Sequence, residues 1–281
     1  MAYDLAWGST HPGLLIYLVD LSGSMDWNDK LTQVSKVVWN VVDCLVAQCQ
    51  NDGVYRNRFQ LKVIGYNEKT YKIYDGDVNA MNDRLDENPN DEQFFNVKKG
   101  NTVNGFAAEG LTHMAMAFDK ASEIIKEWIS GQNFKNVLIP APIVINITDG
   151  YPEEKGLDDQ EAREKALKSA TALKQIAVPD GNVLLFNIHI GENLTKNKTE
   201  ELILPSECPP NERQAFLFNA SSQMDSKFVS RAQGFQLPAV NRSKFMVANM
   251  SDVRMLGRLI VFGSSVSGLP NANRREIPLN Q

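Results

Sequence analysis

An uninterrupted apolar run that closes on a carboxylate lies near the start of the chain, and this feature most restricts the fold. Leu14–Val19 carries no charged side chain and is followed directly by Asp20. A run of this length and composition predicts a buried strand. Residues 142–148 repeat the pattern and are followed by Asp149. The sequence therefore predicts two core strands, each of which places a carboxylate at its carboxyl end.

Segments with helical periodicity separate these strands from further strand-like segments. Apolar residues recur every three or four positions in the helical segments, and Asp29 is expected to cap the first of them. Helices are expected over residues 30–50, 111–128, 158–178 and 251–262, and further strands over 58–67, 182–191 and 243–249, with 70–74 as a hairpin partner or a continuation. Strands joined by such helices pair in parallel through right-handed crossovers. The predicted fold class is therefore α/β, a three-layer Rossmann-like fold with a mostly parallel central sheet and helices on both faces.

The length of 281 residues fits one large domain, which we expect over residues 1–265. Two polar stretches, at about 75–105 and 193–236, are expected to be long loops, and the first carries a short helix near 78–85. Residues 266–281 are rich in Pro and Asn and are expected to form a flexible C-terminal tail.

Composition and charge exclude several function classes. The formal net charge of −5 and the absence of a basic block argue against binding to nucleic acid or to an anionic membrane. The first residues lack the charged and apolar regions of a secretory signal, and no apolar run is long enough to span a bilayer, so we expect a cytoplasmic protein. Three cysteines show neither a disulfide framework nor a zinc spacing.

Oxygen-bearing side chains gather where the predicted strands end. Asp20, Ser22 and Ser24 follow the first strand, Thr112 opens a helix, and Asp149 follows the second core strand. Hard oxygen ligands of this kind suit Mg²⁺, and also Mn²⁺ or Ca²⁺, better than zinc or copper. Two carboxylates barely neutralise a dication, so such a site would accept a carboxylate from another protein.

These five residues resemble the metal-ion-dependent adhesion site of von Willebrand factor A domains. The matching motifs are Asp-Leu-Ser-Gly-Ser at 20–24, Thr112 in Glu-Gly-Leu-Thr and Asp149 in Ile-Thr-Asp-Gly. The resemblance implies that Ser22, Ser24 and Thr112 bind the metal directly and that both aspartates bind it directly or through water. It spans about residues 10–265 and is nearest the bacterial intracellular type, which includes proteins linked to tellurite resistance and stress signalling.

The resemblance implies a non-enzymatic, metal-dependent protein-binding module whose partner completes the metal shell with an Asp or Glu. Two alternatives remain from the sequence: a metal-dependent phosphohydrolase, since an Asp at a strand end also begins many such sites, and a scaffold with a non-essential metal. Trp27 is either an exposed anchor for a partner or folded back onto the helix cap. Asp26 and Glu109 are either helpers of the ligands or solvated charges at the rim.

Overall fold

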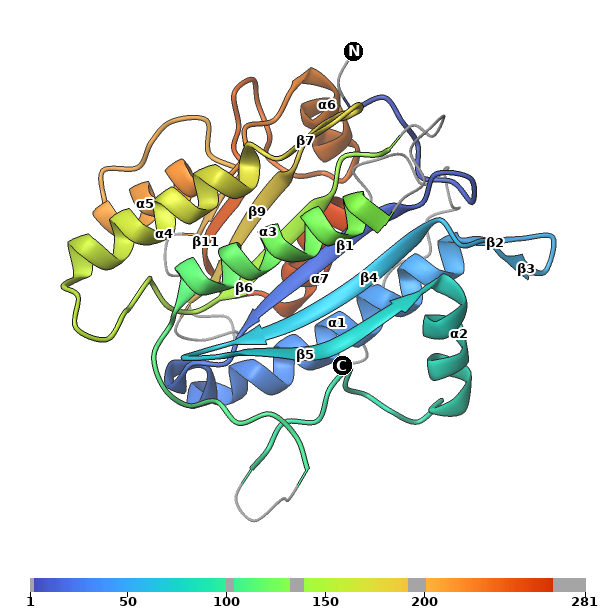
Figure 1. Ribbon diagram of the computed structural model, residues 1–281, viewed down its shortest axis with the longest axis horizontal. Helices are drawn as coiled ribbons and strands as arrows, with labels where there is room; N and C mark the ends of the chain where they lie inside the picture. Colours follow the sequence, from blue (N-terminus) through green and yellow to red (C-terminus); the bar gives the residue numbers. More distant parts are fainter. Residues whose placement is uncertain (1–2, 100–103, 132–138, 192–200, 265–281) are drawn as a thin grey trace.

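A seven-stranded sheet forms the centre of the protein, in the order β10-β11-β9-β6-β1-β4-β5 (Figure 1). The computed structural model describes residues 3–99, 104–131, 139–191 and 201–264. The five inner strands are parallel, whereas the edge strands β5 and β10 run antiparallel to their neighbours. The strands are β1 (Gly13–Asp20), β4 (Phe59–Tyr66), β5 (Thr70–Asp77), β6 (Ile143–Thr148), β9 (Leu184–Ile190), β10 (Leu202–Ile203) and β11 (Met246–Met250).

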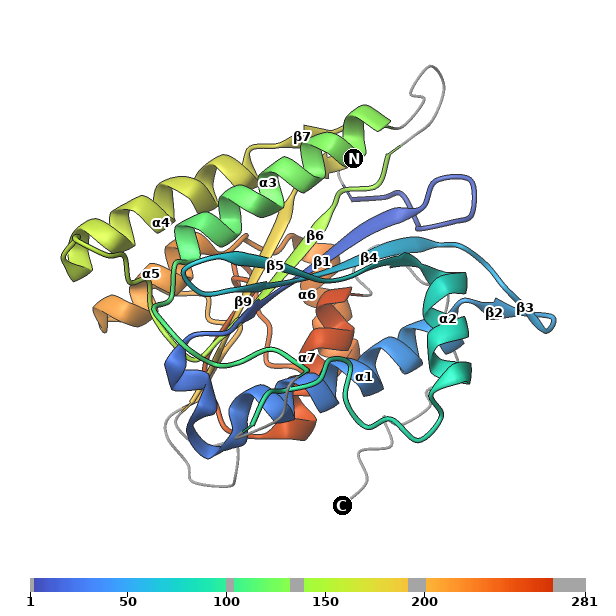
Figure 2. The ribbon, with the colours of Figure 1, turned by 60° about the horizontal axis from the view of Figure 1, so that its bottom comes forward.

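Helices cover both faces of this sheet, which confirms the predicted three-layer α/β fold (Figure 2). One face carries α3 (Met114–Gly131), α4 (Asp159–Lys174) and α5 (Glu212–Ala220). The other carries α1 (Lys30–Gln48), α2 (Val78–Glu87), α6 (Ser226–Gly234) and α7 (Val253–Ser264). Two small hairpins pair β2 (Gln50–Asn51) with β3 (Val54–Tyr55), and β7 (Ala177–Val178) with β8 (Gly181–Asn182).

The position of β1 explains its uninterrupted apolar sequence. Leu15, Tyr17 and Val19 pack in the core beneath α1 and α7, whereas the alternate residues pack in the core beneath α3 and α4. Every residue of the strand is buried, because β1 has a neighbouring strand on each edge and a helical layer on each face. Parallel strands in such a setting carry apolar residues on both sides rather than alternating apolar and polar ones.

Several expected helix ends are shifted in the structure, and two of these differences have a clear cause. Asp29 does not cap α1: it adopts a left-handed conformation (φ 61°), makes no capping hydrogen bond and pairs instead with Lys99. The helix expected to reach Val178 ends at Lys174, because Ala177–Val178 turns back as a hairpin through Gly181.

The polar stretches hold more structure than loops alone. The first carries α2, which begins as expected at Val78 with Asp77 as its cap. The second carries β10, α5 and α6 in its described part. The predicted tail at 266–281 lies outside the described residues. None of the helices described combines the length and the apolar character needed to cross a membrane.

Candidate metal centre

The candidate ligands lie at the carboxyl ends of β1 and β6, which are neighbours in the sheet. The chain leaves β1 towards β4 on one side, and later enters β6 on the other side. The winding direction of the sheet therefore reverses between β1 and β6, and open α/β sheets bind ligands at such a switch point. Asp20 ends β1, and Asp149 follows directly on Thr148, the last residue of β6. The fold thus brings together two carboxylates that are far apart in the sequence.

Asp20 is completely buried, and both of its oxygens accept hydrogen bonds. The backbone N–H of Ser22 donates to Oδ1 at 2.8 Å, and Thr148 Oγ1 donates to Oδ2 at 2.6 Å. Burial raises the pKa of Asp20 to about 7, and the hydrogen bonds from Thr148 and Ser22 offset part of this effect. A buried carboxyl of this kind gains its negative charge most readily when a cation binds next to it.

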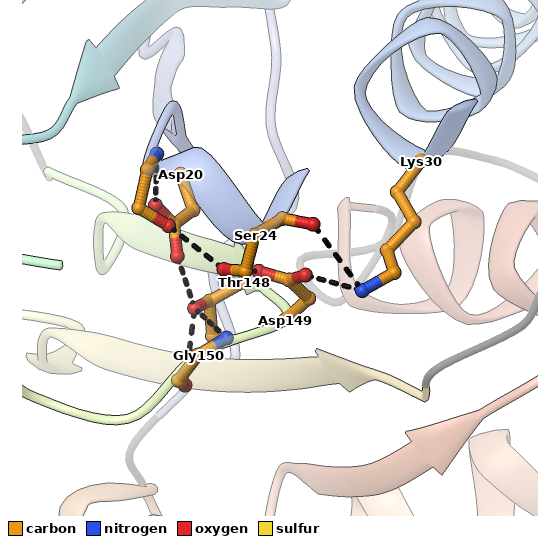
Figure 3. Close-up of polar contacts among 7 residues, drawn as sticks. Asp20, Ser24, Lys30, Thr148, Asp149 and Gly150 are labelled. Carbon is orange, nitrogen blue, oxygen red and sulfur yellow. Dashed lines mark hydrogen bonds and ion pairs between the residues drawn. The ribbon is translucent and has the colours of Figure 1, made fainter. Parts of the chain in front are cut away.

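A chain of side-chain hydrogen bonds links the loop after β1 to the end of β6 (Figure 3). The loop continues into the short 3-10 helix η1 (Gly23–Asp29). Ser22 Oγ lies 3.2 Å from Ser24 Oγ, and Ser24 Oγ donates to Asp149 Oδ1 at 2.7 Å. Four of the five predicted ligands, Asp20, Ser22, Ser24 and Asp149, are therefore connected by direct hydrogen bonds.

Thr112, the fifth predicted ligand, lies in the loop before α3 rather than in the helix itself, which begins at Met114. The absence of a side chain on Gly150 lets Thr112 approach the end of β6. A Cβ on this glycine would lie 2.7 Å from Thr112 Oγ1 and 3.6 Å from Asp20 Oδ2. Both oxygens therefore face the same point beside Gly150. Thr112 Oγ1 donates no hydrogen bond to the residues described and accepts none from them, although the residue is buried, so its lone pairs remain available to a ligand.

Lys30 is a member of the centre that the sequence analysis missed. Its side chain is 4% exposed, and its ammonium donates to Asp149 Oδ2 and, at 3.4 Å, to the backbone oxygen of Ser24 (Figure 3). Lys30 is the first residue of α1 and occurs four positions before Val34 on the buried stripe of that helix. This spacing is the signal in the sequence that could have placed the side chain inside.

Thr148 is the second missed residue, and its role is to hold other groups in place. Its hydroxyl donates to Asp20 and accepts from the backbone N–H of Gly150 at 3.0 Å. It therefore fixes the Asp20 carboxylate and the turn that carries Gly150. The only signal in the sequence is its position directly before Asp149.

The donor set fits a hard dication. It consists of two carboxylates and three hydroxyls, without nitrogen or sulfur, which matches the preference of Mg²⁺, Mn²⁺ or Ca²⁺. The described residues contain no group of three or more His, Cys, Asp or Glu that could hold a metal, so the candidate site depends on its hydroxyl groups. Lys30 is not one of the five expected ligands, but its ammonium adds a positive charge beside Asp149.

The rim of this centre carries one prominent aromatic side chain. Trp27 is 70% exposed, so it does not fold back onto the start of α1. Residues 27 and 28 break the helical geometry of η1, and the chain enters α1 through left-handed Asn28 and Asp29. Asp26 and Glu109 are exposed, as the solvated-charge alternative predicts.

His189 lies next to the centre but is a structural residue. It is buried in β9, its ring lies against Tyr151, and its Nδ1 accepts from the backbone N–H of Asn249 at 3.2 Å. Burial lowers the pKa of His189 to about 4, so the imidazole is neutral at physiological pH.

Comparison with known proteins gives matches in structure only. No protein-family model matches the chain, and no curated protein sequence does. Manganese-loaded TRAP from Plasmodium vivax is similar at 19% identity over 66% of this chain and 59% of that one, with a TM-score of 0.39. The pilus adhesin SpaC from Lactobacillus rhamnosus GG is similar at 15% identity over 66% of this chain and 25% of that one, with a TM-score of 0.41.

Proximal thread matrix protein 1 from the mussel byssus is similar at 14% identity over 89% of this chain and 47% of that one, with a TM-score of 0.45. A second structure of that protein has a zinc-occupied MIDAS motif, the name of the metal-ion-dependent adhesion site. This chain spans 59% or less of the length of each of these three proteins. At such identities and scores the likenesses carry no functional argument, and the fold assignment rests on the strand order itself.

Proposed function

We propose that this chain is a protein-binding module of the von Willebrand factor A type, in which a divalent cation joins the chain to an acidic residue of its partner. Ser22, Ser24 and Thr112 would hold the ion, with Asp20 and Asp149 binding it directly or through water. The observation that carries the proposal is the convergence of these oxygens at the β1–β6 switch point, where the Thr112 hydroxyl has no hydrogen-bond partner among the residues described. The bacterial intracellular subtype, the link to tellurite resistance or stress, and the cytoplasmic location remain predictions from the sequence.

The charge balance supports binding of an acid. Asp20 and Asp149 carry two negative charges when ionised, and the Lys30 ammonium cancels one of them. A dication added to this group leaves a net positive charge in a largely buried setting. A carboxylate from a partner would restore neutrality, and it would bind more strongly there than at an exposed site because the local dielectric constant is low.

Trp27 supports a protein as that partner. The segment that carries Ser24 also carries this large exposed aromatic side chain, which offers apolar area to a partner. Tryptophan is among the residues that contribute most to protein interfaces. The proposed partner surface is therefore an Asp or Glu with an apolar side chain beside it.

The contacts of Asp20 favour binding over the phosphohydrolase alternative. A catalytic nucleophile must reach its substrate, yet Asp20 is fully buried and both of its oxygens are engaged by Ser22 and Thr148. No other carboxylate lies two residues after it, because Ser22 occupies that position. We therefore propose a module without catalytic activity.

The test selects ligands in the presence of metal and then removes the metal. Random peptides displayed on phage would be panned against the full chain in MgCl₂, with MnCl₂ and CaCl₂ in parallel. Selected peptides should require an Asp or Glu, lose binding when that residue becomes Asn or Gln, and dissociate on addition of a chelator. Asp20→Asn should abolish binding, whereas the exposed neighbour Asp26→Asn should retain it.

Two outcomes would reject the proposal. Peptides that bind equally well in chelator would exclude a metal-completed interface. Metal-dependent hydrolysis of a generic phosphoester, lost in Asp20→Asn, would establish the phosphohydrolase instead.

A further inference from the structure

An open hollow lies at the opposite end of the sheet from the metal centre. It has a volume of about 480 Å³ and is lined by the segment 6–11, by Asn51 of the β2–β3 hairpin, and by Arg56 and Arg58 before β4. In Figure 2 this hairpin lies where β1 and β4 begin, whereas η1 lies where β1 ends. The eight residues of β1 separate the two sites by roughly 23 Å, at about 3.3 Å per residue.

Arg56 and Arg58 line the same hollow, whereas the residue between them does not. The intervening Asn57 points elsewhere: its amide donates to Asp77 Oδ2 at 2.8 Å, and its oxygen accepts from the N–H of Asn79. Backbone contacts fix the segment, since the N–H of Arg56 donates to Cys49 O and Arg58 O accepts from the N–H of Gly13.

The lining is positively charged and lacks a counter-charge. Neither Arg56 nor Arg58 forms an ion pair or a side-chain hydrogen bond within the part of the chain described. His11 adds a third nitrogen-bearing side chain, whose Nδ1 lies 2.9 Å from Thr10 Oγ1. The lining contains no Asp or Glu, although the whole chain has a net charge of −5. The nearest carboxylate in the sequence, Asp52, lies at the tip of the hairpin and is not part of the lining.

The floor of the hollow is rigid. Trp7 is 3% exposed, and its indole packs so closely on Gly13 that a Cβ there would lie 2.1 Å from the ring. The same ring lies 5.7 Å from the ring of Phe59, the first residue of β4. An indole that is buried against two core strands gives the hollow a rigid base.

We propose that this hollow binds a small organic molecule that carries phosphate groups. Guanidinium groups bind phosphate through paired N–H donors, and two of them on one wall match a ligand with more than one anionic group. The volume lies in the range of small-molecule sites and exceeds the needs of a single inorganic phosphate. This site is independent of the metal centre and of the function proposed for it.

Calorimetric titration of the full chain with inorganic pyrophosphate, in chelator, tests the proposal with the simplest such probe. Saturable binding is expected, with at least a tenfold loss in both Arg56→Gln and Arg58→Gln. Arg58→Lys should bind at an intermediate level, since it keeps the charge and loses the paired donors. Arg254→Gln is the matched control, because Arg254 is an exposed arginine of α7 outside the lining. It should bind as the wild type does, and so should Asp20→Asn.

The absence of saturable binding by the folded wild-type chain would overturn the proposal. An equal loss in Arg254→Gln would also overturn it, since that result indicates attraction to overall charge. Circular dichroism spectra and melting curves of each variant separate loss of binding from loss of the fold. A parallel titration with citrate distinguishes phosphate from carboxylate anions, and tighter binding of citrate would reject the phosphate assignment.

Discussion

Replacement of Lys30 by Met tests the charge balance of the metal centre, because Met keeps an apolar stem of similar length and removes the ammonium. The side chains of Lys30 and Asp149 are 4% and 1% exposed, so their ion pair is buried. Removing one member of a buried pair costs about 3–5 kcal/mol, since the other charge remains uncompensated. We expect Lys30→Met to lose about that much free energy of unfolding in chelator.

A divalent cation should reverse this loss. In the wild type the metal shares Asp149 with the ammonium, whereas in Lys30→Met the metal alone neutralises the carboxylate. If about 1.4–2.8 kcal/mol of the lost pairing reappears in metal binding, the Kd for Mg²⁺ falls by roughly 10- to 100-fold. Mg²⁺ should therefore stabilise the variant more than the wild type at the same concentration.

Urea unfolding with and without MgCl₂, together with calorimetric titration, measures both effects. Lys36→Met is the matched control, because Lys36 forms an exposed pair with Glu92 on the same helix. An exposed pair contributes about 0–1 kcal/mol, so this variant should change little in either measurement. Weaker Mg²⁺ binding in Lys30→Met, or unchanged stability in chelator, would refute the idea that the ammonium competes with the metal for Asp149.

Further variants test the contacts around this centre and the titration of one partly buried lysine. Gly150→Ala would place a methyl group 2.7 Å from Thr112 Oγ1, so calorimetry should show at least a tenfold weaker affinity for Mg²⁺ in a chain that still folds, and unchanged affinity would exclude Thr112 as a ligand. Thr148→Val leaves Oδ2 of buried Asp20 without its donor, while Oδ1 keeps the backbone N–H of Ser22, and should cost about 1–3 kcal/mol in urea unfolding, which Thr148→Ser should largely restore. Burial lowers the pKa of Lys174 to about 8 from 10.5, so between these values the unfolded chain binds a proton that the folded chain has released. Wild type should therefore gain stability relative to Lys174→Met as the pH rises through this window, and parallel pH profiles would contradict that assignment.

The sequence alone predicted the sheet because its core strands have an unusual composition. Leu14–Val19 and Ile143–Thr148 are buried on both faces of the sheet. A short apolar run of this kind between helical segments is typical of a parallel strand that is covered by helices on both sides. The hairpin formed by β4 and β5, left open between two alternatives, also follows from the short turn between Tyr66 and Thr70. The periodicity of apolar residues and the length of a turn depend only on neighbouring residues, so both can be recognised in a single sequence.

Lys30 could not be placed with the same ease, because its position depends on a contact between distant segments. A lysine in the first turn of a helix is normally solvated, and burial of its ammonium becomes acceptable only when Asp149 arrives from β6. The failed prediction for Asp29 has a related cause. Composition favours aspartate as a cap, yet here Asn28 and Asp29 both adopt left-handed conformations, and Asp29 pairs with Lys99.

Polar side chains in the sheet that already have hydrogen-bond partners are structural, whereas a polar side chain without a partner is a candidate ligand. Asn146 lies inside β6, where it accepts from Tyr66 Oη at 2.9 Å and donates to Asn187 Oδ1 at 3.1 Å. Asn187 in turn donates to Ser221 Oγ at 3.0 Å, so the amides satisfy one another across the buried sheet. Thr112 is also a buried residue, but its Oγ1 has no such partner among the residues described. The sequence alone shows each of them only as a polar residue inside or next to an apolar segment. The contacts alone show that the amides serve the core, whereas the threonine oxygen remains available to a ligand.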